Sequence, residues 1–233
     1  MKLRERSSPN FDARPGAGTV DMLILHYTGM RTAKEALDRL CDPAAKVSAH
    51  YLIEEDGTAW RLVNEGRRAW HAGISSWRGR SDINGASIGI ELANPGHEFG
   101  YRPFPEPQMA AFEELAREIL ARHPIPARHV LGHSDVAPQR KQDPGELFDW
   151  ERLARAKIGL WPDFDASAQS PQGTAELQAA LAEIGYGCPA SGELDAETQA
   201  VLAAFQRHFR PALCNGQPDE ETRHRIAVLA RAV

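Results

Sequence analysis

Two histidines and an aspartate stand where the chain leaves predicted strands. His26 is near the end of the apolar run VDMLILHY, and His133 follows the run HVL. Asp143 lies in the loop GHSDVAPQRKQDPG, residues 132–145, which is too rich in proline and glycine to form a helix or strand. Two imidazoles and a carboxylate are a plausible three-ligand zinc set that leaves the fourth tetrahedral position for water. Strand-end histidines also occur as merely hydrogen-bonded residues, and no compact His-Glu-x-x-His motif is present, so spacing alone leaves both interpretations open.

Glu91 and Lys141 are candidate catalytic groups. In the segment SIGIEL, strand alternation puts Glu91 on the face opposite the two isoleucines, so an acid projects from an apolar strand. Such a carboxylate needs an arginine partner, or it serves as a general base whose pKa the apolar surroundings raise. Lys141 lies two residues before Asp143, and extended chain would point both side chains to the same side. Its ammonium could stabilise an oxyanion or simply be solvated.

Strands and helices that would position these groups follow from hydrophobic periodicity. An Asp-Gly pair at 56–57 predicts a hairpin turn inside 49–63, and Pro105 begins an amphipathic stretch. This pattern predicts an α/β (α+β) domain with a mixed central sheet flanked by helices. We expect strands at 20–27, on both sides of the hairpin turn, at 86–94 and at 127–133, and helices at 32–41, 105–123 and 147–159.

The composition changes after residue 165. The segment ASAQSPQG, residues 166–173, is small and polar, as expected of a linker. We therefore predict a first domain at 1–165, which includes an N-terminal arm, and a small three-helix domain at 174–233. Its helices are expected near 174–184, 196–209 and 219–231, and its core is predicted to contain Leu177, Leu181, Ile184, Val201, Leu202, Phe205, Ile226 and Leu229.

Five sequence blocks together resemble a known family. LILHYTG, SAHYLI, AWHAG, SIGIEL and GHSDVAPQRKQDPG, in this order and spacing, are similar to the zinc-dependent N-acetylmuramoyl-L-alanine amidases of the type 2 amidase family. That family is related to phage T7 lysozyme and the peptidoglycan-recognition proteins. The resemblance implies that His26, His133 and Asp143 bind Zn²⁺, that Glu91 is the general base and that Lys141 stabilises the oxyanion. The implied reaction is hydrolysis of the amide between N-acetylmuramic acid and L-alanine of peptidoglycan or muropeptides.

The tail resembles the three-helix peptidoglycan-binding module. Its Leu-Asp-x-x-Thr and Phe-Gln signatures match Leu194 to Thr198 and Phe205-Gln206. The resemblance implies that the tail binds wall polymer. The alternative is a helical appendage that serves only packing.

Four further residues are candidates for contact with the substrate. His50, Trp70, His71 and Asn94 could stack on the sugar or hydrogen bond to the peptide. Each could equally be a framework residue, and His50 could instead orient a metal ligand.

Two other functions are compatible with these residues. A non-catalytic peptidoglycan receptor would bind glycopeptide without cutting it, although such receptors lack the full set of five groups. A zinc hydrolase acting on another amide, such as a deacetylase, would keep the set and change the product.

The composition excludes some partners. The net charge is -5, and no run of five or six like charges occurs, so we expect no nucleic-acid partner. No segment approaches the length of an integral membrane span. Cys41, Cys188 and Cys214 match no zinc ribbon or disulfide framework and are interpreted as small apolar residues, with a Cys188–Cys214 bridge as the alternative.

The compartment is open at this stage. The start MKLRERSSPNFDARPGAG lacks the apolar stretch of a secretory leader. We expect a cytoplasmic protein if the sequence is complete, and a periplasmic or cell-wall-associated one if a leader was removed or export is non-classical. A wall-binding module favours the second compartment.

Overall fold

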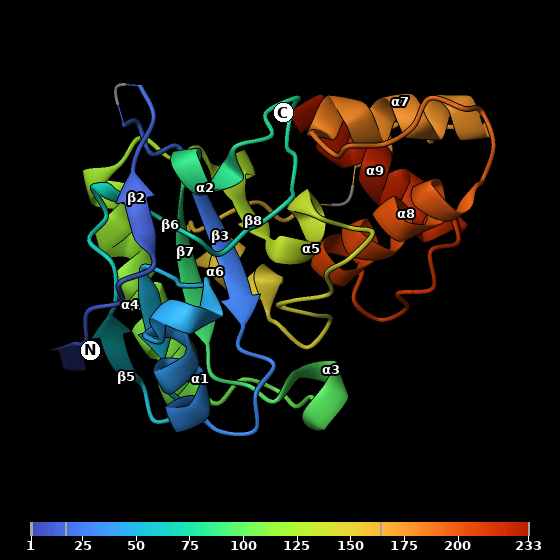
Figure 1. Cartoon of the computed structure of the whole chain (residues 1–233). Coiled ribbons are helices and arrows are strands. Elements are labelled where there is room, and N and C mark those ends of the chain that lie inside the picture. Colours follow the sequence, from blue (N-terminus) through green and yellow to red (C-terminus); the bar gives the residue numbers. More distant parts are fainter. Residues whose placement is uncertain (1, 17, 164, 233) are drawn as a thin grey trace.

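Six strands form a central sheet in the order β1-β5-β4-β7-β3-β8 (Figure 1). Strands β4, β7, β3 and β8 are parallel to one another, β5 is antiparallel to β4, and β1 is parallel to β5. The predicted mixed sheet is therefore confirmed. The computed structural model describes residues 2–16, 18–163 and 165–232. The strands are β1 (Lys2–Glu5), β3 (Met22–Tyr27), β4 (Tyr51–Ile53), β5 (Thr58–Arg61), β7 (Ser87–Leu92) and β8 (Val130–Gly132).

The helices lie close to where periodicity predicts them. The expected long amphipathic helix is α4, and the three helices of the tail are α7, α8 and α9. The bounds are α1 (Ala33–Leu40), α4 (Glu106–Arg122), α6 (Trp150–Arg155), α7 (Thr174–Ile184), α8 (Ala196–Phe209) and α9 (Glu220–Ala232). Shorter helical turns are α2 (Ile83–Ala86), α3 (Gly96–Phe99), α5 (His133–Val136), η1 (Pro43–Ala45) and η2 (Ala127–His129).

The N-terminal arm adds strands that the sequence did not predict. It supplies β1 at the sheet edge and β2 (Phe11–Ala13), which pairs with β6 (Arg67–Ala69) in a second, two-stranded sheet. Both strands of the arm are exposed throughout, so no buried apolar face left an alternating pattern to detect. The arm also buries the Arg14 guanidinium, which donates hydrogen bonds to the carbonyls of Glu65, Asn84, Gly85 and Ser87.

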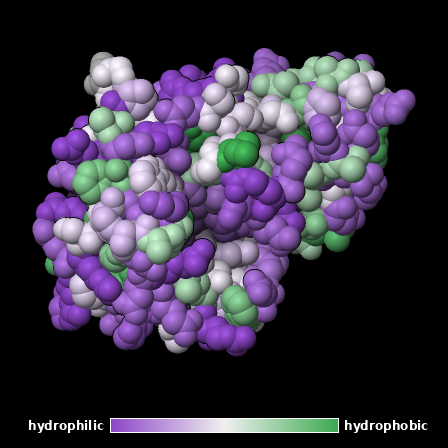
Figure 2. Space-filling model, viewed as in Figure 1, coloured by the Kyte–Doolittle hydropathy of each residue, from purple (hydrophilic) through white to green (hydrophobic). Residues whose placement is uncertain are grey.

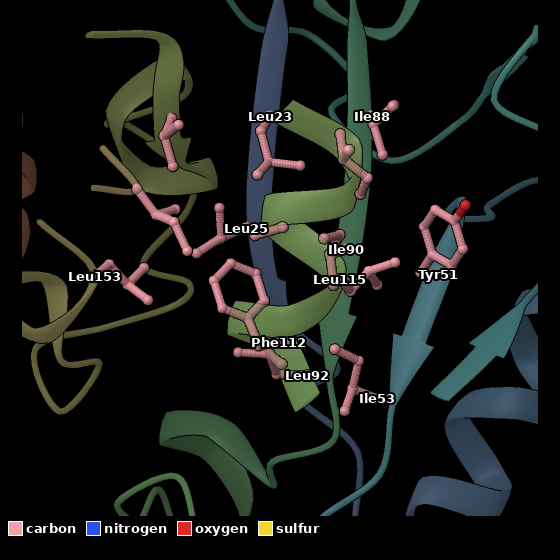
Figure 3. Close-up of a cluster of buried hydrophobic side chains, with 14 of the residues drawn as sticks. Leu23, Leu25, Tyr51, Ile53, Ile88, Ile90, Leu92, Phe112, Leu115 and Leu153 are labelled. Atoms are coloured by element: carbon pink, nitrogen blue, oxygen red, sulfur yellow. The ribbon is translucent and has the colours of Figure 1, made fainter. Parts of the chain in front are cut away.

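One face of the sheet packs against α4. Strand alternation directs Ile88, Ile90 and Leu92 of β7 to this face, where Phe112 and Leu115 of α4 meet them (Figure 3). All of these side chains are at most 1% exposed. This core therefore fixes β7 and β3 on the α4 side of the sheet, and the carboxyl ends of these strands remain available for a site.

The opposite face packs toward the C-terminal helices. Met22 and Ile24 of β3 and Leu131 of β8 belong to one buried cluster with Trp77 and with apolar residues of α7, α8 and α9. Residues 174–232, here called the helical unit, appear in orange and red beside the sheet in Figure 1. Every apolar residue predicted for their core is buried. The domain boundaries stay a prediction, but sheet and helical unit share this continuous apolar cluster.

The cysteines, the helix lengths and the surface also bear on what the sequence led us to expect. Cys41, Cys188 and Cys214 are free and half-buried, so the alternative of a Cys188–Cys214 bridge is wrong. Among the described residues, no helix has the length and apolar character needed to cross a membrane. The face in Figure 2 is largely hydrophilic with scattered hydrophobic residues.

Candidate metal centre

The structure brings His26, His133 and Asp143 together at one edge of the sheet. His26 lies near the end of β3, and His133 directly follows the neighbouring parallel strand β8. The two imidazole Nδ1 atoms are 3.0 Å apart, and each is 3.0 Å from Oδ2 of Asp143. All three side chains are buried. Their ligand atoms lie within 4.8 Å of one another, which is the arrangement that one small cation requires.

Hydrogen bonds fix the tautomer of His26. The Ser87 hydroxyl donates to the carbonyl of Ile83 (2.6 Å), so its oxygen accepts from Nε2 of His71 (3.2 Å). Nδ1 of His71 therefore accepts from Nε2 of His26, 3.0 Å away. His26 consequently presents an unprotonated Nδ1 toward Asp143 and His133, as a metal ligand must.

The tautomer of His133 is fixed by the backbone. Its Nε2 lies 2.9 Å from the carbonyl oxygen of Ala72, which can only accept. The Nδ1 lone pair of His133 thus faces the same point as Nδ1 of His26. Arg140 holds this part of the chain, because its guanidinium donates to the carbonyls of Ala72 and Ile74.

Charges at the centre match those of a metal site. Burial, together with the neighbouring His133, lowers the pKa of His26 to about 4, so this ring is neutral near pH 7. Burial by itself raises the pKa of Asp143, but the two histidines outweigh burial and hold that pKa well below its usual range. Zinc binding needs neutral imidazole ligands and an ionised carboxylate, and the lowered pKa values of His26 and Asp143 agree with that requirement. Three converging acceptors without a donor between them fit a bound cation.

Glu91 and Lys141 line the same cavity, which measures about 460 Å³. Glu91 pairs with His26 across β7 and β3, so its side chain stands beside the ligand set. Its Oε2 is buried and has no hydrogen-bond partner among the described residues. Burial and the charge of Asp143 raise the pKa of Glu91 well above its usual value. Lys141 has no hydrogen-bond or ion-pair partner for its ammonium within the described part of the chain.

The four predicted substrate contacts lie in different surroundings. His71 reaches the cavity wall, but its two ring nitrogens serve the chain from Ser87 to His26. His50 is fully buried, where its Nδ1 accepts from the amide of Gly89 and its Nε2 donates to the carbonyl of Arg67. Neither Trp70 nor Asn94 lines the cavity. The side chain of Asn94 bridges the amide of Gly96 and the carbonyl of Arg102. His50, His71 and Asn94 thus make the framework contacts that the sequence offered as the alternative, and their contact with a substrate stays a prediction.

Three residues important to the centre were not found from sequence. Ser87 and Arg140 act through hydrogen bonds to residues far away in the chain, so no local pattern marks them. Gly89 did carry a signal, because a glycine inside a strand often marks close approach of another group. A Cβ on Gly89 would lie 2.4 Å from the ring of His71, so only glycine lets this ring lie against β7.

Comparison with known proteins agrees with this geometry. Residues 16–146 match the family described as N-acetylmuramoyl-L-alanine amidase. This chain belongs to that family. Residues 170–226 of the amidase match the family described as "Putative peptidoglycan binding domain". The predicted resemblances, and the expectation of an amide-hydrolysing enzyme, are therefore confirmed.

Relatives and solved structures cover most of the amidase. It is 40% identical over 223 residues to N-acetylmuramoyl-L-alanine amidase AmiD of Escherichia coli, a match spanning 87% of this chain and 79% of AmiD. It is 35% identical over 167 residues to 1,6-anhydro-N-acetylmuramyl-L-alanine amidase AmpD of Haemophilus influenzae, spanning 64% of this chain and 89% of AmpD.

Two of the solved structures include a ligand. E. coli AmiD in complex with the substrate anhydro-N-acetylmuramic acid-L-Ala-D-gamma-Glu-L-Lys superimposes with a TM-score of 0.82 at 37% identity, covering 97% of this chain and 93% of that one. AmpDh3 of Pseudomonas aeruginosa in complex with anhydromuramic pentapeptide gives 0.82 at 33% identity, covering 97% and 95%.

Proposed function

We propose that this amidase is a zinc hydrolase that cleaves the amide between N-acetylmuramic acid and L-alanine in peptidoglycan or muropeptides. The observation that carries the proposal is one cavity that joins a three-ligand metal set, an unpaired carboxyl group and a free ammonium. Zinc bound there would supply a water molecule whose pKa falls to about 7 and would polarise the scissile carbonyl.

Glu91 acts as the proton carrier. Its position beside His26 lets it accept a proton from the attacking water and deliver it to the leaving nitrogen, without which the amine leaves poorly. Its raised pKa suits this shuttle, since the carboxyl group binds and releases a proton nearer neutral pH than an exposed glutamate does.

Lys141 stabilises the charge that develops on the carbonyl oxygen. Its ammonium lines the cavity with Asp143 and makes no hydrogen bond or ion pair with a described residue, so it can meet an oxyanion. The loss of one such donor typically costs about 3 kcal/mol of transition-state stabilisation.

The substrate class follows from the relatives and from the tail. AmiD and AmpDh3 were solved with anhydromuramyl peptides, which supports muropeptides as substrates. The match of residues 170–226 to a wall-binding family supports polymeric peptidoglycan as well. Comparing rates on soluble muropeptides and on intact sacculi ranks the two.

Glu91→Gln tests the mechanism. We expect the variant to retain zinc and to lose turnover of a muropeptide by roughly 10²- to 10⁴-fold, because the shuttle is gone while the metal ligands stay. Turnover is measured by mass spectrometry of the released peptide, and zinc by metal analysis. Glu98→Gln is the matched control, since Glu98 is an exposed carboxylate of the same cavity.

Near-normal turnover of Glu91→Gln would overturn the assignment of the base. The products also separate the alternatives. A deacetylase would release acetate and leave the peptide attached, and a receptor would bind the muropeptide and release nothing.

A further inference from the structure

A buried carboxylate lies two residues beyond the metal ligand His133. Asp135 is 0% exposed and accepts three hydrogen bonds, each 2.7 Å long. The donors are the amide of Gly132, the hydroxyl of Tyr186 and Nδ1 of His208. A buried carboxylate is tolerated only when such donors replace its lost water. Two of the three come from the helical unit.

Asp135 closes the short turn that carries the ligand His133. Its Oδ2 accepts from the amide of Gly132, so residues 132–135 form a closed loop around His133; we call this loop the ligand turn. The amide of Ser134, in the same turn, donates to the carbonyl of Asp143 at 2.9 Å. The ligand turn therefore sets the spacing between two of the three metal ligands.

Packing holds both donors of the helical unit in place. The imidazole of His208 is stacked between Trp150 (ring centroids 3.7 Å apart) and Phe209 (3.8 Å), and is 2% exposed. Tyr186 is 3% exposed, and its ring meets Trp77 edge to face at 4.9 Å. Neither ring can turn away from Asp135 without breaking these contacts.

A second attachment joins the helical unit to the loop that hydrogen bonds to His133. Arg78 donates from its guanidinium to the carbonyls of Glu183 and Ile184 and from its amide to that of Gly185. A Cβ on Gly185, whose φ is +140°, would lie 2.6 Å from Trp77, so the fit is close. Arg78 belongs to the loop that begins at Ala72, whose carbonyl accepts from His133.

We infer that the helical unit is part of the metal centre: Tyr186 and His208 hold Asp135, and Asp135 is a positioning residue that sets where His133 stands. This role is separate from any binding of wall polymer by the same helices. It rests on the proposed metal site, and it makes metal geometry and turnover of small soluble substrates depend on two side chains of the C-terminal helices.

The experiment removes the two donors and keeps the full chain. In Tyr186→Phe/His208→Leu both hydrogen bonds are lost, while rings or apolar bulk remain. In Tyr186→Phe/His208→Asn the amide nitrogen of asparagine can replace Nδ1 of histidine. Readouts are zinc affinity by chelator competition, the visible absorption of the Co²⁺-substituted protein, which reports ligand geometry, and kcat and KM on a soluble muropeptide.

We expect the Leu variant to bind zinc about tenfold more weakly, to show a changed Co²⁺ spectrum, and to lose kcat with KM little altered. The Asn variant should recover most of each loss. Gln178→Met is the matched control, because this buried amide binds Ser191, Glu193 and Thr198 inside the helical unit and does not touch Asp135. It should lower thermal stability and leave zinc affinity and the spectrum unchanged.

Wild-type zinc affinity and an unchanged Co²⁺ spectrum in the Leu variant would overturn the inference and leave Asp135 a purely structural anchor. If that variant does not fold, Tyr186→Phe alone decides, since it removes one oxygen: a weaker zinc affinity supports the inference, and wild-type affinity contradicts it. Metal affinity and spectrum are read without substrate. A wild-type protein that binds zinc but releases no peptide would therefore contradict the proposed function alone.

Discussion

Single hydrogen bonds decide whether the two imidazoles can act as ligands. His26 and His133 each use Nε2 to donate, to His71 and to the carbonyl of Ala72, so that both Nδ1 lone pairs face Asp143. For His26 the tautomer is determined two hydrogen bonds away, by the hydroxyl of Ser87. Ser87, which is not one of the candidate metal ligands, therefore sets the protonation pattern of His26.

Ser87→Ala tests this chain of hydrogen bonds. Without the hydroxyl, Nε2 of His71 is a buried donor with no acceptor, which costs about 1–3 kcal/mol unless the proton moves to the other nitrogen. That move would oblige His26 to carry its proton on the side of the metal. We expect zinc affinity, measured by chelator competition, to fall about tenfold.

Ser8→Ala is the control for Ser87→Ala. Ser8 is also buried and also makes two hydrogen bonds, to the carbonyl of Leu40 and from the amide of Asn10, but it is not connected to the ligands. It should lose some stability and no zinc affinity. Equal zinc affinity in both serine variants would contradict the tautomer assignment.

The sequence alone predicts a residue of the centre only where a local pattern marks that residue. His26 and His133 stand out because they lie at the ends of apolar runs, and Asp143 stands out because it sits in a recognisable block. Ser87 and Asp135 do not, because the partners that connect them to the centre or to the helical unit (His71 for Ser87, and Tyr186 and His208 for Asp135) lie 16 or more residues away, and only the folded chain brings them together. His50 and Asn94, predicted as candidates for substrate contact, make hydrogen bonds to the backbone, which no local pattern in the sequence reveals.

Strand β7 connects the core to the centre through simple alternation. Ile88, Ile90 and Leu92 pack on α4, while Ser87, Gly89 and Glu91 face the other way. On that second face Ser87 accepts from His71, Gly89 leaves room for its ring, and Glu91 lines the cavity. The segment SIGIEL shows this alternation, and it correctly predicted that Glu91 lies on the face opposite the isoleucines. The neighbours of that face come from other elements and could not be read from the segment.

The carboxylate of Glu65 links strand β4 to the end of helix α4. Its carboxylate accepts from Tyr51 of β4 (2.6 Å), from Arg122 at the end of α4 (2.7 Å) and from the adjacent His123 (2.7 Å). Burial by itself raises the pKa of Glu65, but these donors outweigh burial and lower it from 4.5 to about 2. The folded state therefore favours the ionised carboxylate.

Glu65→Gln should make this contribution visible through its pH dependence. A folded-state pKa below the unfolded value stabilises the protein at all pH values above the unfolded pKa, and the stabilisation disappears as the pH falls from about 4.5 to about 2. Urea unfolding at pH 7 should show a loss of about 2–3 kcal/mol in the variant, and the difference from wild type should shrink below pH 4. Glu118→Gln, which removes an exposed partner of Arg122, should cost less than about 1 kcal/mol at every pH. A loss in Glu65→Gln that does not depend on pH would contradict the assignment.

At the scale of the whole molecule, the sheet and the helical unit share one apolar interior. The cluster that contains Met22, Ile24 and Leu131 of the sheet continues through Trp77 and Tyr186 to α7, α8 and α9. The sequence predicted three helices with a small core of their own and a linker before them. It could not predict that this core opens onto the sheet, because the stripe of a helix shows which residues are buried and not what covers them.

Phe205→Ala tests whether sheet and helices unfold together. Phe205 is 0% exposed and packs against Tyr186 and Phe209, so its truncation should cost about 3–5 kcal/mol. If the shared cluster makes one cooperative unit, native-state hydrogen exchange should show amides of β3 and β7 losing protection by the same free energy as amides of α8. Leu213→Ala, at a side chain that is 46% exposed, should change neither set. If sheet amides keep wild-type protection in Phe205→Ala, the helical unit opens independently of the sheet. The ligand turn would then lose its Tyr186 and His208 donors in a fraction of molecules whose sheet is still folded.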